Sequence, residues 1–334
     1  MRKFKAAVVG CGRIGCNFDK DPKRKYISTH IGAYINFPET QLVAVCDKNK
    51  RNLEECTRYW NIEKGYTDVK SMLKNEKIDI LSICTPPQTH YSILKEAVNF
   101  PLKAIFCEKP ISDNIKEAYK MVELCKERGV ILQINHQRRF DPLHIKLKQL
   151  IKDKKYGKVQ QINFYYTAGI KNTGSHMFDL LRYLFGEVEW IIGFFSKNKS
   201  AKKNDPNIDG LLQFKDKVLC TFKSCSVQNY LIFELDCLLE RARFVLKNSG
   251  FKLDFFIIKN SKYFSGYKEL FPARAPFSTE YKRNFMIEAV KFLVNCIKYK
   301  KESISKGEDG LKALELIEAS IKSAERGGER IYLS

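Results

Sequence analysis

Short apolar runs alternate with amphipathic stretches along the first 140 residues of the chain. The apolar runs are typical of buried strands, and they cover residues 4–9, 41–46, 78–84, 104–107 and 130–134. The clearest amphipathic stretch covers residues 113–128, and it predicts a helix that is closed by Gly129. Strands that alternate with helices predict a parallel, doubly wound sheet, in which ligands bind beyond the carboxyl ends of the strands.

The pattern changes after about residue 140. Longer runs follow one another there, and we predict strands at residues 160–167, 190–196, 210–214, 218–226, 233–239 and 244–246. Their alternation of apolar and polar positions predicts a mostly antiparallel, open sheet with one exposed face. A helix that begins at His176 and ends at Phe185 is expected to interrupt this sheet. Another helix, which could pack back on the first domain, is predicted at residues 308–326.

Length and composition limit the classes of protein to consider. A chain of 334 residues predicts two domains, and an apolar content of 44% is high enough to build their cores. No apolar run approaches the roughly 20 residues that cross a bilayer, and no cleavage site follows the basic start of the chain. We therefore expect a cytoplasmic protein without a membrane partner. The 11 cysteines include no C-x-x-C pair, which argues against a zinc site or a disulfide framework.

The net charge of +21 favours anionic partners. The basic residues are scattered, however, and the densest cluster, residues 197–203, contains no aromatic side chain. Proteins that bind single-stranded nucleic acid interleave basic residues with aromatic ones that stack on the bases. We therefore predict no nucleic-acid partner and interpret the charge as solvated surface.

A G-x-G-x-x-G motif at Gly10, Gly12 and Gly15 follows the first predicted strand. Glycines in this position let a dinucleotide pyrophosphate approach backbone N–H groups where a helix begins. We expect Arg13 and Ile14, which lie between these glycines, to bind the cofactor as well. The alternative is a loop that only caps the helix.

Asp47 ends the second predicted strand and is expected to bind the adenosine ribose. Its charge would repel a 2′-phosphate, so we predict NAD, although Lys50 and Arg51 leave NADP open. The alternative is an ordinary surface aspartate. Asp47 follows Gly15 by 32 positions instead of about 20, which predicts an insertion around Asn17–Thr29.

Further motifs follow at the predicted strand ends and in the second half of the chain. They are Thr85-Pro86-Pro87-Gln88-Thr89-His90, Glu108-Lys109-Pro110, residues 135–142, Gly174-Ser175-His176 with Asp179, and Gly307 to Leu311. In this order, and together with Gly10–Gly15 and Asp47, they resemble the Gfo/Idh/MocA oxidoreductases. The resemblance implies a Rossmann domain, here residues 1–137, and an α+β domain, here residues 138–334. It also implies a sheet that often serves oligomerisation, so a homodimer or homotetramer is expected.

Lys109 lies at the carboxyl end of a predicted strand and precedes Pro110. Its ammonium group would point into the cofactor crevice, where it could bind a substrate hydroxyl and exchange a proton. A surface Glu–Lys pair is the alternative. The resemblance implies that Lys109 is catalytic. It also implies that Lys109 lies beside the cofactor, together with Glu108, Thr85, Pro86 and His90.

His176, Asp179 and Tyr183 share one face of the predicted helix. The residues alone favour a surface pair at the start of this helix, but the resemblance implies that His176 is catalytic. Many members of the family carry an aspartate four residues earlier, where this chain has Asn172. Three interpretations follow: Lys109 and His176 suffice for proton transfer, the proton follows another route, or the protein binds a dinucleotide without turnover. We favour the first two, because Lys109 and His176 are both present. We expect Asn172, His176 and Asp179 to contact the substrate.

Two further sets of residues have less distinct roles. Arg138 and Arg139 follow the fifth predicted strand, where Arg139 is expected to bind a substrate anion, although interdomain salt bridges are an equal alternative. His30 and His144 have no partner at metal-ligand spacing, so we interpret them as structural and predict no metal.

These observations together predict an NAD(P)-dependent oxidoreductase that transfers a hydride between the nicotinamide and a carbinol or carbonyl carbon. The resemblance implies a sugar, polyol or nucleotide sugar as its substrate. The positive charge would suit a nucleotide sugar, as used in the synthesis of surface carbohydrates. The alternative is a dinucleotide-binding regulator of the same fold without catalysis.

Overall fold

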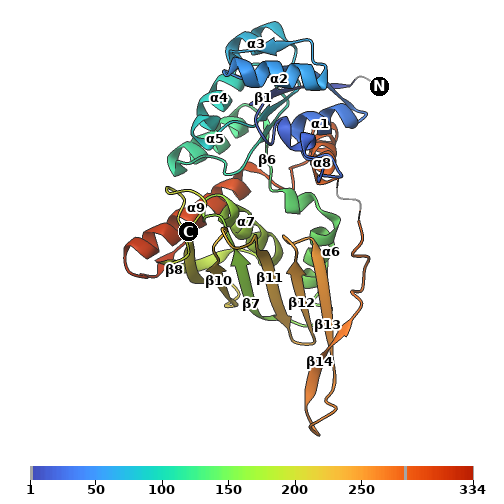
Figure 1. Ribbon diagram of the computed structural model, residues 1–334, viewed down its shortest axis with the longest axis vertical. Coiled ribbons are helices and arrows are strands. Elements are labelled where there is room, and N and C mark those ends of the chain that lie inside the picture. Colours follow the sequence, from blue (N-terminus) through green and yellow to red (C-terminus); the bar gives the residue numbers. More distant parts are fainter. Residues whose placement is uncertain (1–2, 282–283, 334) are drawn as a thin grey trace. The chain divides into compact units, whose positions relative to one another are not determined.

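The apolar runs at the start of the chain form a six-stranded sheet, which is entirely parallel and has the order β3-β2-β1-β4-β5-β6. The strands are β1 Phe4–Val9, β2 Thr40–Cys46, β3 Gly65–Tyr66, β4 Ile80–Ile83, β5 Ala104–Cys107 and β6 Ile131–Ile134. Strands β2 and β3 follow β1 toward one edge of the sheet, and β5 and β6 follow β4 toward the other edge. Right-handed crossovers therefore place helices on both faces, which confirms the predicted doubly wound sheet (Figure 1).

Local capping residues define the helices around this sheet. They are α1 His30–Asn36, α2 Lys50–Trp60, α3 Val69–Asn75, α4 His90–Ala97, α5 Ile115–Glu127 and α8 Phe285–Tyr299, with short 3₁₀ helices η1 Asn17–Lys20, η2 Pro87–Thr89 and η3 Gln137–Phe140. In α5 the Asn114 side chain accepts hydrogen bonds from the N–H groups of Lys116 and Glu117. Gly129 follows this helix with φ +63°, a conformation that glycine adopts without strain.

The computed structural model describes residues 3–281 and 284–333. The chain divides into one unit of residues 1–141 and 282–314 and another of residues 142–281 and 315–334. Helix α8 thus returns to the first unit, where it packs against α1, β6 and η3. A hydrogen bond of 3.1 Å from Gln133 Nε2 to the carbonyl oxygen of Ala289 anchors it. The sequence pattern did not reveal this return, and the expected division followed residue 137.

The second unit contains a nine-stranded sheet of order β14-β13-β12-β11-β7-β10-β9-β8-β15. Its strands are β7 Val159–Tyr166, β8 Val188–Phe195, β9 Ile208–Phe214, β10 Leu219–Ser224, β11 Phe233–Leu239, β12 Ala242–Lys247, β13 Lys252–Asn260, β14 Lys268–Ala273 and β15 Ile331–Tyr332. Every neighbouring pair is antiparallel except β7 with β10, so the predicted mostly antiparallel sheet is confirmed. The sequence analysis did not identify β13, β14 or β15.

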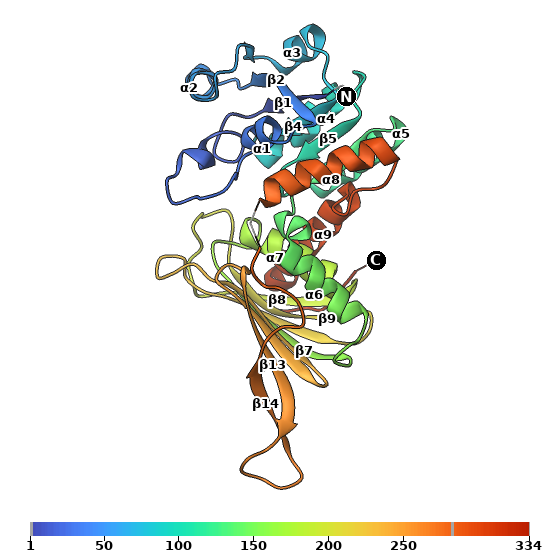
Figure 2. The same ribbon diagram turned by 90° about the vertical axis from the view of Figure 1, so that its right-hand side faces the viewer.

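Three helical segments cover one face of this second sheet (Figure 2). They are α6 Pro142–Lys152, α7 Thr173–Phe185 and the second half of α9 Gly307–Glu325. The rings of Phe178 on α7 and Phe222 on β10 lie 5.5 Å apart in an edge-to-face contact, and Gly193 on β8 donates its N–H to the Ser323 hydroxyl of α9. Strands β11 and β12 alternate between buried and half-exposed positions, which leaves the other face partly open.

Candidate functional site

The G-x-G-x-x-G segment lies at the carboxyl ends of β1 and β4, where the winding direction of the sheet reverses. Gly10 has φ +100°, and a Cβ there would lie 2.7 Å from the backbone of Cys84. A Cβ at Gly15 would lie 2.0 Å from the carbonyl oxygen of Gly10. A Cβ at Gly12, in contrast, would meet no described atom within 4 Å. The fold itself therefore requires Gly10 and Gly15, whereas Gly12 faces open space.

The segment after Gly12 is a single helical turn that offers free donors. The N–H group of Cys16 donates to the carbonyl oxygen of Gly12 at 2.9 Å. The N–H groups of Gly12, Arg13 and Ile14 have no acceptor among the described residues. Free N–H groups at the start of a helical turn, next to open space, form a site suited to an anion such as a pyrophosphate.

This helical turn is interrupted and resumes as α1, although the motif was expected to open a continuous helix. The N–H group of His30 donates to the carbonyl oxygen of Ile14 at 3.1 Å, and that of Ile31 donates to Gly15 at 3.2 Å. In an unbroken helix, residues 18 and 19 would make these two bonds. Residues 18–29 are therefore a 12-residue insertion, and without it Asp47 would follow Gly15 by the usual 20 positions or so.

Asp19 closes the insertion. Its carboxylate accepts a hydrogen bond of 2.6 Å from the N–H group of Ser28 and one of 2.5 Å from the Thr29 hydroxyl. The Thr29 hydroxyl also accepts from the N–H group of Gly32 and so caps α1. These bonds fix the place where α1 begins and thereby the position of His30.

Asp47 lies directly beside the glycine turn, as the sequence predicted for an acid at the end of β2. Its Oδ2 accepts a hydrogen bond of 2.8 Å from the N–H group of Cys11, and its Oδ1 accepts one of 2.9 Å from Asn49. Arg51, which could attract a 2′-phosphate, forms an exposed ion pair with Glu55 at 2.9 Å. The local charges therefore favour a ribose with free hydroxyl groups.

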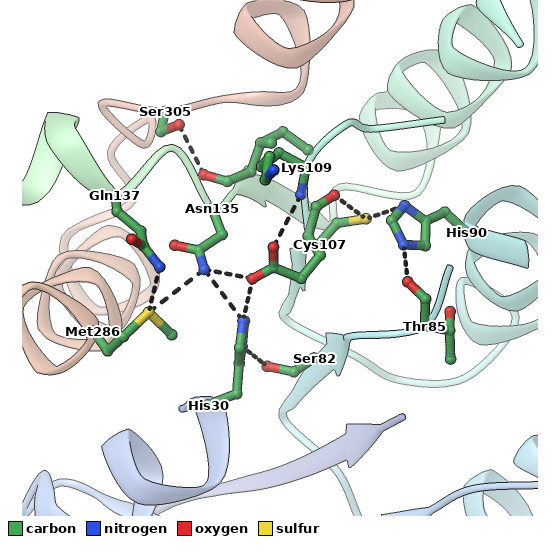
Figure 3. A network of polar contacts seen from close by, with 12 residues as sticks. His30, Ser82, Thr85, His90, Cys107, Lys109, Asn135, Gln137, Met286 and Ser305 are labelled. Atoms are coloured by element: carbon green, nitrogen blue, oxygen red, sulfur yellow. Dashed lines mark hydrogen bonds and ion pairs between the residues drawn. The ribbon is translucent and has the colours of Figure 1, made fainter. Parts of the chain in front are cut away.

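A buried polar network holds the Glu108-Lys109-Pro110 turn after β5 (Figure 3). Glu108 is only 7% exposed, and its Oε1 accepts hydrogen bonds from His30 Nε2 at 2.9 Å and from Asn135 Nδ2 at 2.5 Å. Its Oε2 accepts from the N–H group of Lys109 at 3.3 Å. Burial opposes ionisation, but the hydrogen bonds from His30 and Asn135 and the nearby Lys109 charge hold the pKa of Glu108 below its usual value.

His90 connects the loops that follow β4 and β5. Its Nε2 lies 2.8 Å from the carbonyl oxygen of Thr85, and its Nδ1 lies 3.0 Å from that of Ile111. Burial lowers the pKa of His90, so the ring is neutral at physiological pH. The ring has no exposed surface. The expected contribution of His90 to cofactor binding is therefore indirect, through the Thr85-Pro86 loop that it anchors.

Arg139 lies in an interior ion pair. Its Nη2 is 3.0 Å from Asp309 Oδ1, and its Nη1 donates to the carbonyl oxygen of Ile304 at 2.8 Å. The side chain is 7% exposed. These contacts correspond to the salt-bridge alternative of the sequence analysis, except that both partners belong to the first unit. They join the 282–314 segment to the end of β6, while anion binding by Arg139 stays a prediction.

The predicted helix of the second unit begins at Thr173, three residues before His176, so the expectation that His176 begins it is wrong. Asp205 accounts for this start, because its carboxylate accepts the N–H groups of Lys171 at 2.7 Å and of Asn172 at 3.0 Å. His176 is half-buried in the first turn of α7, and Asn172 is exposed before it. Asp179, one turn further on, is only 1% exposed.

Sequence reasoning missed the residues that surround Glu108. His30 was interpreted as structural, and Ser82 and Asn135 carried no signal of their own. A partial signal for His30 was available, because it follows the Ser28-Thr29 capping pair at the end of the predicted insertion. Its partner Glu108, however, lies 78 positions away in the sequence.

Cysteine and metal chemistry have no visible basis in the described residues. All eleven cysteines are free, and burial raises the pKa of the Cys84 and Cys107 thiols well above the usual value. No group of three or more His, Cys, Asp or Glu side chains in the described ranges is arranged to hold a metal ion. Nor is any helix of residues 3–281 and 284–333 long and apolar enough to cross a membrane.

Comparison with known families matches both halves of the chain. Residues 4–136 match the Gfo/Idh/MocA model described as an oxidoreductase family with an NAD-binding Rossmann fold. Residues 170–333 match the companion model, the C-terminal alpha/beta domain of the same oxidoreductase family. The two matches confirm the predicted fold class, and the first confirms NAD as the predicted cofactor.

Curated relatives match over a shorter stretch. The chain is 33% identical over 199 residues to the scyllo-inositol 2-dehydrogenase (NAD(+)) of Bacillus subtilis, which is 55% of this chain and 54% of that protein. It is 26% identical over 218 residues to a D-apiose dehydrogenase of Paraburkholderia graminis, which is 60% of this chain and 55% of that protein. The chain thus spans about half the length of the curated relatives that it matches.

Solved structures match over the whole chain. The WlbA dehydrogenase from Bordetella pertussis, solved in complex with NADH and UDP-GlcNAcA, has a TM-score of 0.81 at 21% identity, with 100% of this chain and 99% of that chain covered. An oxidoreductase from Agrobacterium radiobacter, solved with NAD+, L-tartaric acid and magnesium, has a TM-score of 0.80 at 17% identity, with 99% and 98% covered. At these identities the likeness shows the fold.

Proposed function

The chain belongs to the Gfo/Idh/MocA family of oxidoreductases, and from this premise we propose that it is an NAD-dependent dehydrogenase or reductase of a sugar or polyol. The proposal rests on one observation above the others. The open glycine turn and the Glu108-Lys109 turn both follow the carboxyl ends of central strands in the same parallel sheet. A dinucleotide and a proton-exchanging ammonium group would therefore meet at one edge of that sheet.

The residues around Gly12 fit NAD. The free N–H groups of Gly12, Arg13 and Ile14 suit a pyrophosphate, and the space where a Cβ of Gly12 would lie allows it to approach them. The Asp47 carboxylate, held by Cys11 and Asn49, suits the hydroxyl groups of the adenosine ribose. Bound NAD would supply hydride chemistry at the substrate carbon.

We assign the movement of the substrate proton to Lys109 and His176. The Lys109 ammonium group would donate a hydrogen bond to the reacting oxygen and would receive or deliver its proton as the hydride moves. Histidine is suited to the same work near neutral pH, and the family resemblance implies this role for His176. Asn172 can orient a hydroxyl group but cannot exchange a proton, so we assign it to substrate binding.

The test is the absorbance of reduced nicotinamide, followed with NAD or NADP and a panel of polyols, free sugars and nucleotide sugars. Lys109→Ala is expected to lower turnover by about 100-fold or more, because general acid–base groups contribute roughly that much. NAD affinity, measured by calorimetry, should stay unchanged. Lys103→Ala is the matched control, because Lys103 precedes the same strand β5 at its amino end and forms an ion pair with Asp79 there.

Three outcomes would separate the alternatives. Turnover that Lys109→Ala abolishes and Lys103→Ala preserves supports the dehydrogenase. Turnover unaffected by Lys109→Ala removes this residue from the mechanism. Tight NAD binding without turnover on any member of the panel contradicts the proposal and favours a dinucleotide-binding regulator.

A further inference from the structure

His30 has no role in the mechanism described above, although it lies at the centre of the buried network. The ring is fully buried, with Nε2 2.9 Å from Glu108 Oε1 and Nδ1 2.8 Å from the Ser82 hydroxyl. The Ser82 hydroxyl lies 2.8 Å from the Tyr34 hydroxyl as well. A series of four hydrogen-bonded polar side chains therefore runs from α1 through β4 to the residue before Lys109. Figure 3 shows the contact between His30 and Ser82.

The positions of the hydrogen atoms in this series of four side chains can be assigned from its two ends. Ionised Glu108 only accepts hydrogen bonds, so His30 Nε2 must carry a proton and donate it. At the other end, the Tyr34 hydroxyl has Ser82 as its only hydrogen-bond partner among the described residues. Burial raises the pKa of Tyr34, so its hydroxyl keeps its proton.

Tyr34 therefore donates to Ser82, and the Ser82 hydroxyl donates its own proton onward to His30 Nδ1. His30 Nδ1 is then an acceptor, so the ring is neutral and carries its proton on Nε2. Every group in the series is satisfied by this arrangement. An imidazolium would direct a second N–H at Ser82, whose oxygen can accept it together with the Tyr34 proton, and would leave the Ser82 proton without an acceptor among the described residues.

The neutral ring determines what stabilises the Glu108 charge. Three N–H donors contact the carboxylate, from His30, Asn135 and the Lys109 backbone. In this arrangement all three are neutral donors, and together they fix the orientation of the carboxylate. Because Oε2 of the same carboxylate accepts the Lys109 backbone N–H, the orientation of Glu108 fixes the turn from which the Lys109 side chain extends.

We propose that His30 is a positioning residue for Lys109. Its neutral Nε2–H imidazole holds the Glu108 carboxylate in one orientation, and the carboxylate in turn accepts the Lys109 backbone N–H and so fixes the turn from which the Lys109 ammonium group serves the substrate. Asp19 and the capped start of α1 set the position of the His30 ring, so the insertion also contributes to the positioning of Lys109. In its kinetic consequences this inference rests on the dehydrogenase function proposed above.

The kinetic test compares three variants of α1. His30→Leu removes the donor to Glu108 and is expected to lower kcat by about 100-fold with KM and NAD affinity unchanged, as for a small misplacement of a catalytic group. His30→Gln restores an amide donor and should recover most of the lost kcat. Tyr34→Phe is the matched control, because it breaks the same series in an equally buried position but leaves the His30–Glu108 bond intact.

Positioning and purely structural roles predict different results in this comparison. Under the proposal, Tyr34→Phe lowers the melting temperature but keeps kcat within about threefold. The proposal is overturned if His30→Leu retains kcat, or if His30→Leu and Tyr34→Phe both lose activity in proportion to their lost stability.

A second measurement needs no substrate and therefore stands apart from the proposed function. The nitrogen NMR spectrum of the ¹⁵N-histidine-labelled wild-type protein at pH 7 reports which ring nitrogens carry protons. The His30 signals, identified by their loss in His30→Gln, should show a protonated Nε2 and an unprotonated Nδ1. An imidazolium or the opposite tautomer would overturn the inference even if the protein proves to be a dehydrogenase.

Discussion

Alanine substitutions at the three glycines of one motif should separate folding from cofactor binding. The Cβ of Gly15→Ala would lie 2.0 Å from the carbonyl oxygen of Gly10, whereas ordinary contacts begin at 3.4 Å. Neither backbone atom can move without shifting β1, so we expect a loss of about 3 kcal/mol or more in the free energy of unfolding. Gly10→Ala combines a 2.7 Å contact with φ +100°, which adds roughly 1–2 kcal/mol of backbone strain.

Gly12→Ala should behave in the opposite way. Because its Cβ meets no described atom within 4 Å, the free energy of unfolding should change by no more than about 0.5 kcal/mol. The added methyl group occupies the space that the pyrophosphate needs above the free N–H groups. We expect NAD affinity to fall by about 10- to 100-fold, which corresponds to roughly 1.4–2.8 kcal/mol.

Two assays are sufficient to test this series. Urea unfolding of the unliganded variants gives their stability, and calorimetric titration with NAD gives the affinity of those that fold. Gly15→Ala and Gly10→Ala should lose stability in urea unfolding, whereas Gly12→Ala should keep its stability and lose only NAD affinity. A Gly12→Ala variant that binds NAD as tightly as the wild type would refute the proposed pyrophosphate site at the free N–H groups. A Gly12→Ala variant that is as unstable as Gly15→Ala would refute the packing argument.

Two further predictions concern the free energy of unfolding. Arg139→Leu removes the cation beside the half-buried Asp309 carboxylate and should lower the free energy of unfolding by about 2 kcal/mol, whereas Arg326→Leu, at an exposed pair, should cost less than about 1 kcal/mol in the same urea titration. The folded-state pKa of His90 is lower than that of the unfolded chain, so below about pH 6.5 the unfolded state binds a proton that the folded state does not. Stability should therefore decrease as the pH falls from that value toward the folded-state pKa, and a His90→Gln variant with an unchanged pH dependence would contradict this assignment.

The parallel sheet and its motifs could be recognised from the sequence because their signals are local. Each apolar run between residues 4 and 134 contains a strand, and Gly129 follows α5 where the pattern placed it, although the helix begins at Ile115 instead of residue 113. The weaker strands β13, β14 and β15 escaped detection. Their positions are partly exposed, so the alternation of apolar and polar residues is less distinct there.

In the candidate site, too, the features that depend on neighbouring residues were predicted and those that depend on distant contacts were not. The glycine turn, Asp47 and the Glu108-Lys109-Pro110 turn were each expected at a strand end, because a turn depends on the types of a few neighbouring residues. The spacing of 32 positions between Gly15 and Asp47 even predicted the insertion that the split helix shows. The distinct roles of Gly10, Gly12 and Gly15 were not predictable, since they depend on what each Cβ would meet in space.

The sequence by itself thus determined the fold class, the positions of most strands and the chemistry available at their ends, because periodicity and turn residues act over a few neighbouring positions. Only the tertiary structure decided which distant side chains meet. It paired His30 with Glu108, 78 positions apart, enclosed Arg139 with Asp309, and returned α8 to the first unit. Such pairings depend on how packed elements exclude water and satisfy buried polar groups, and these conditions exist only in the folded chain.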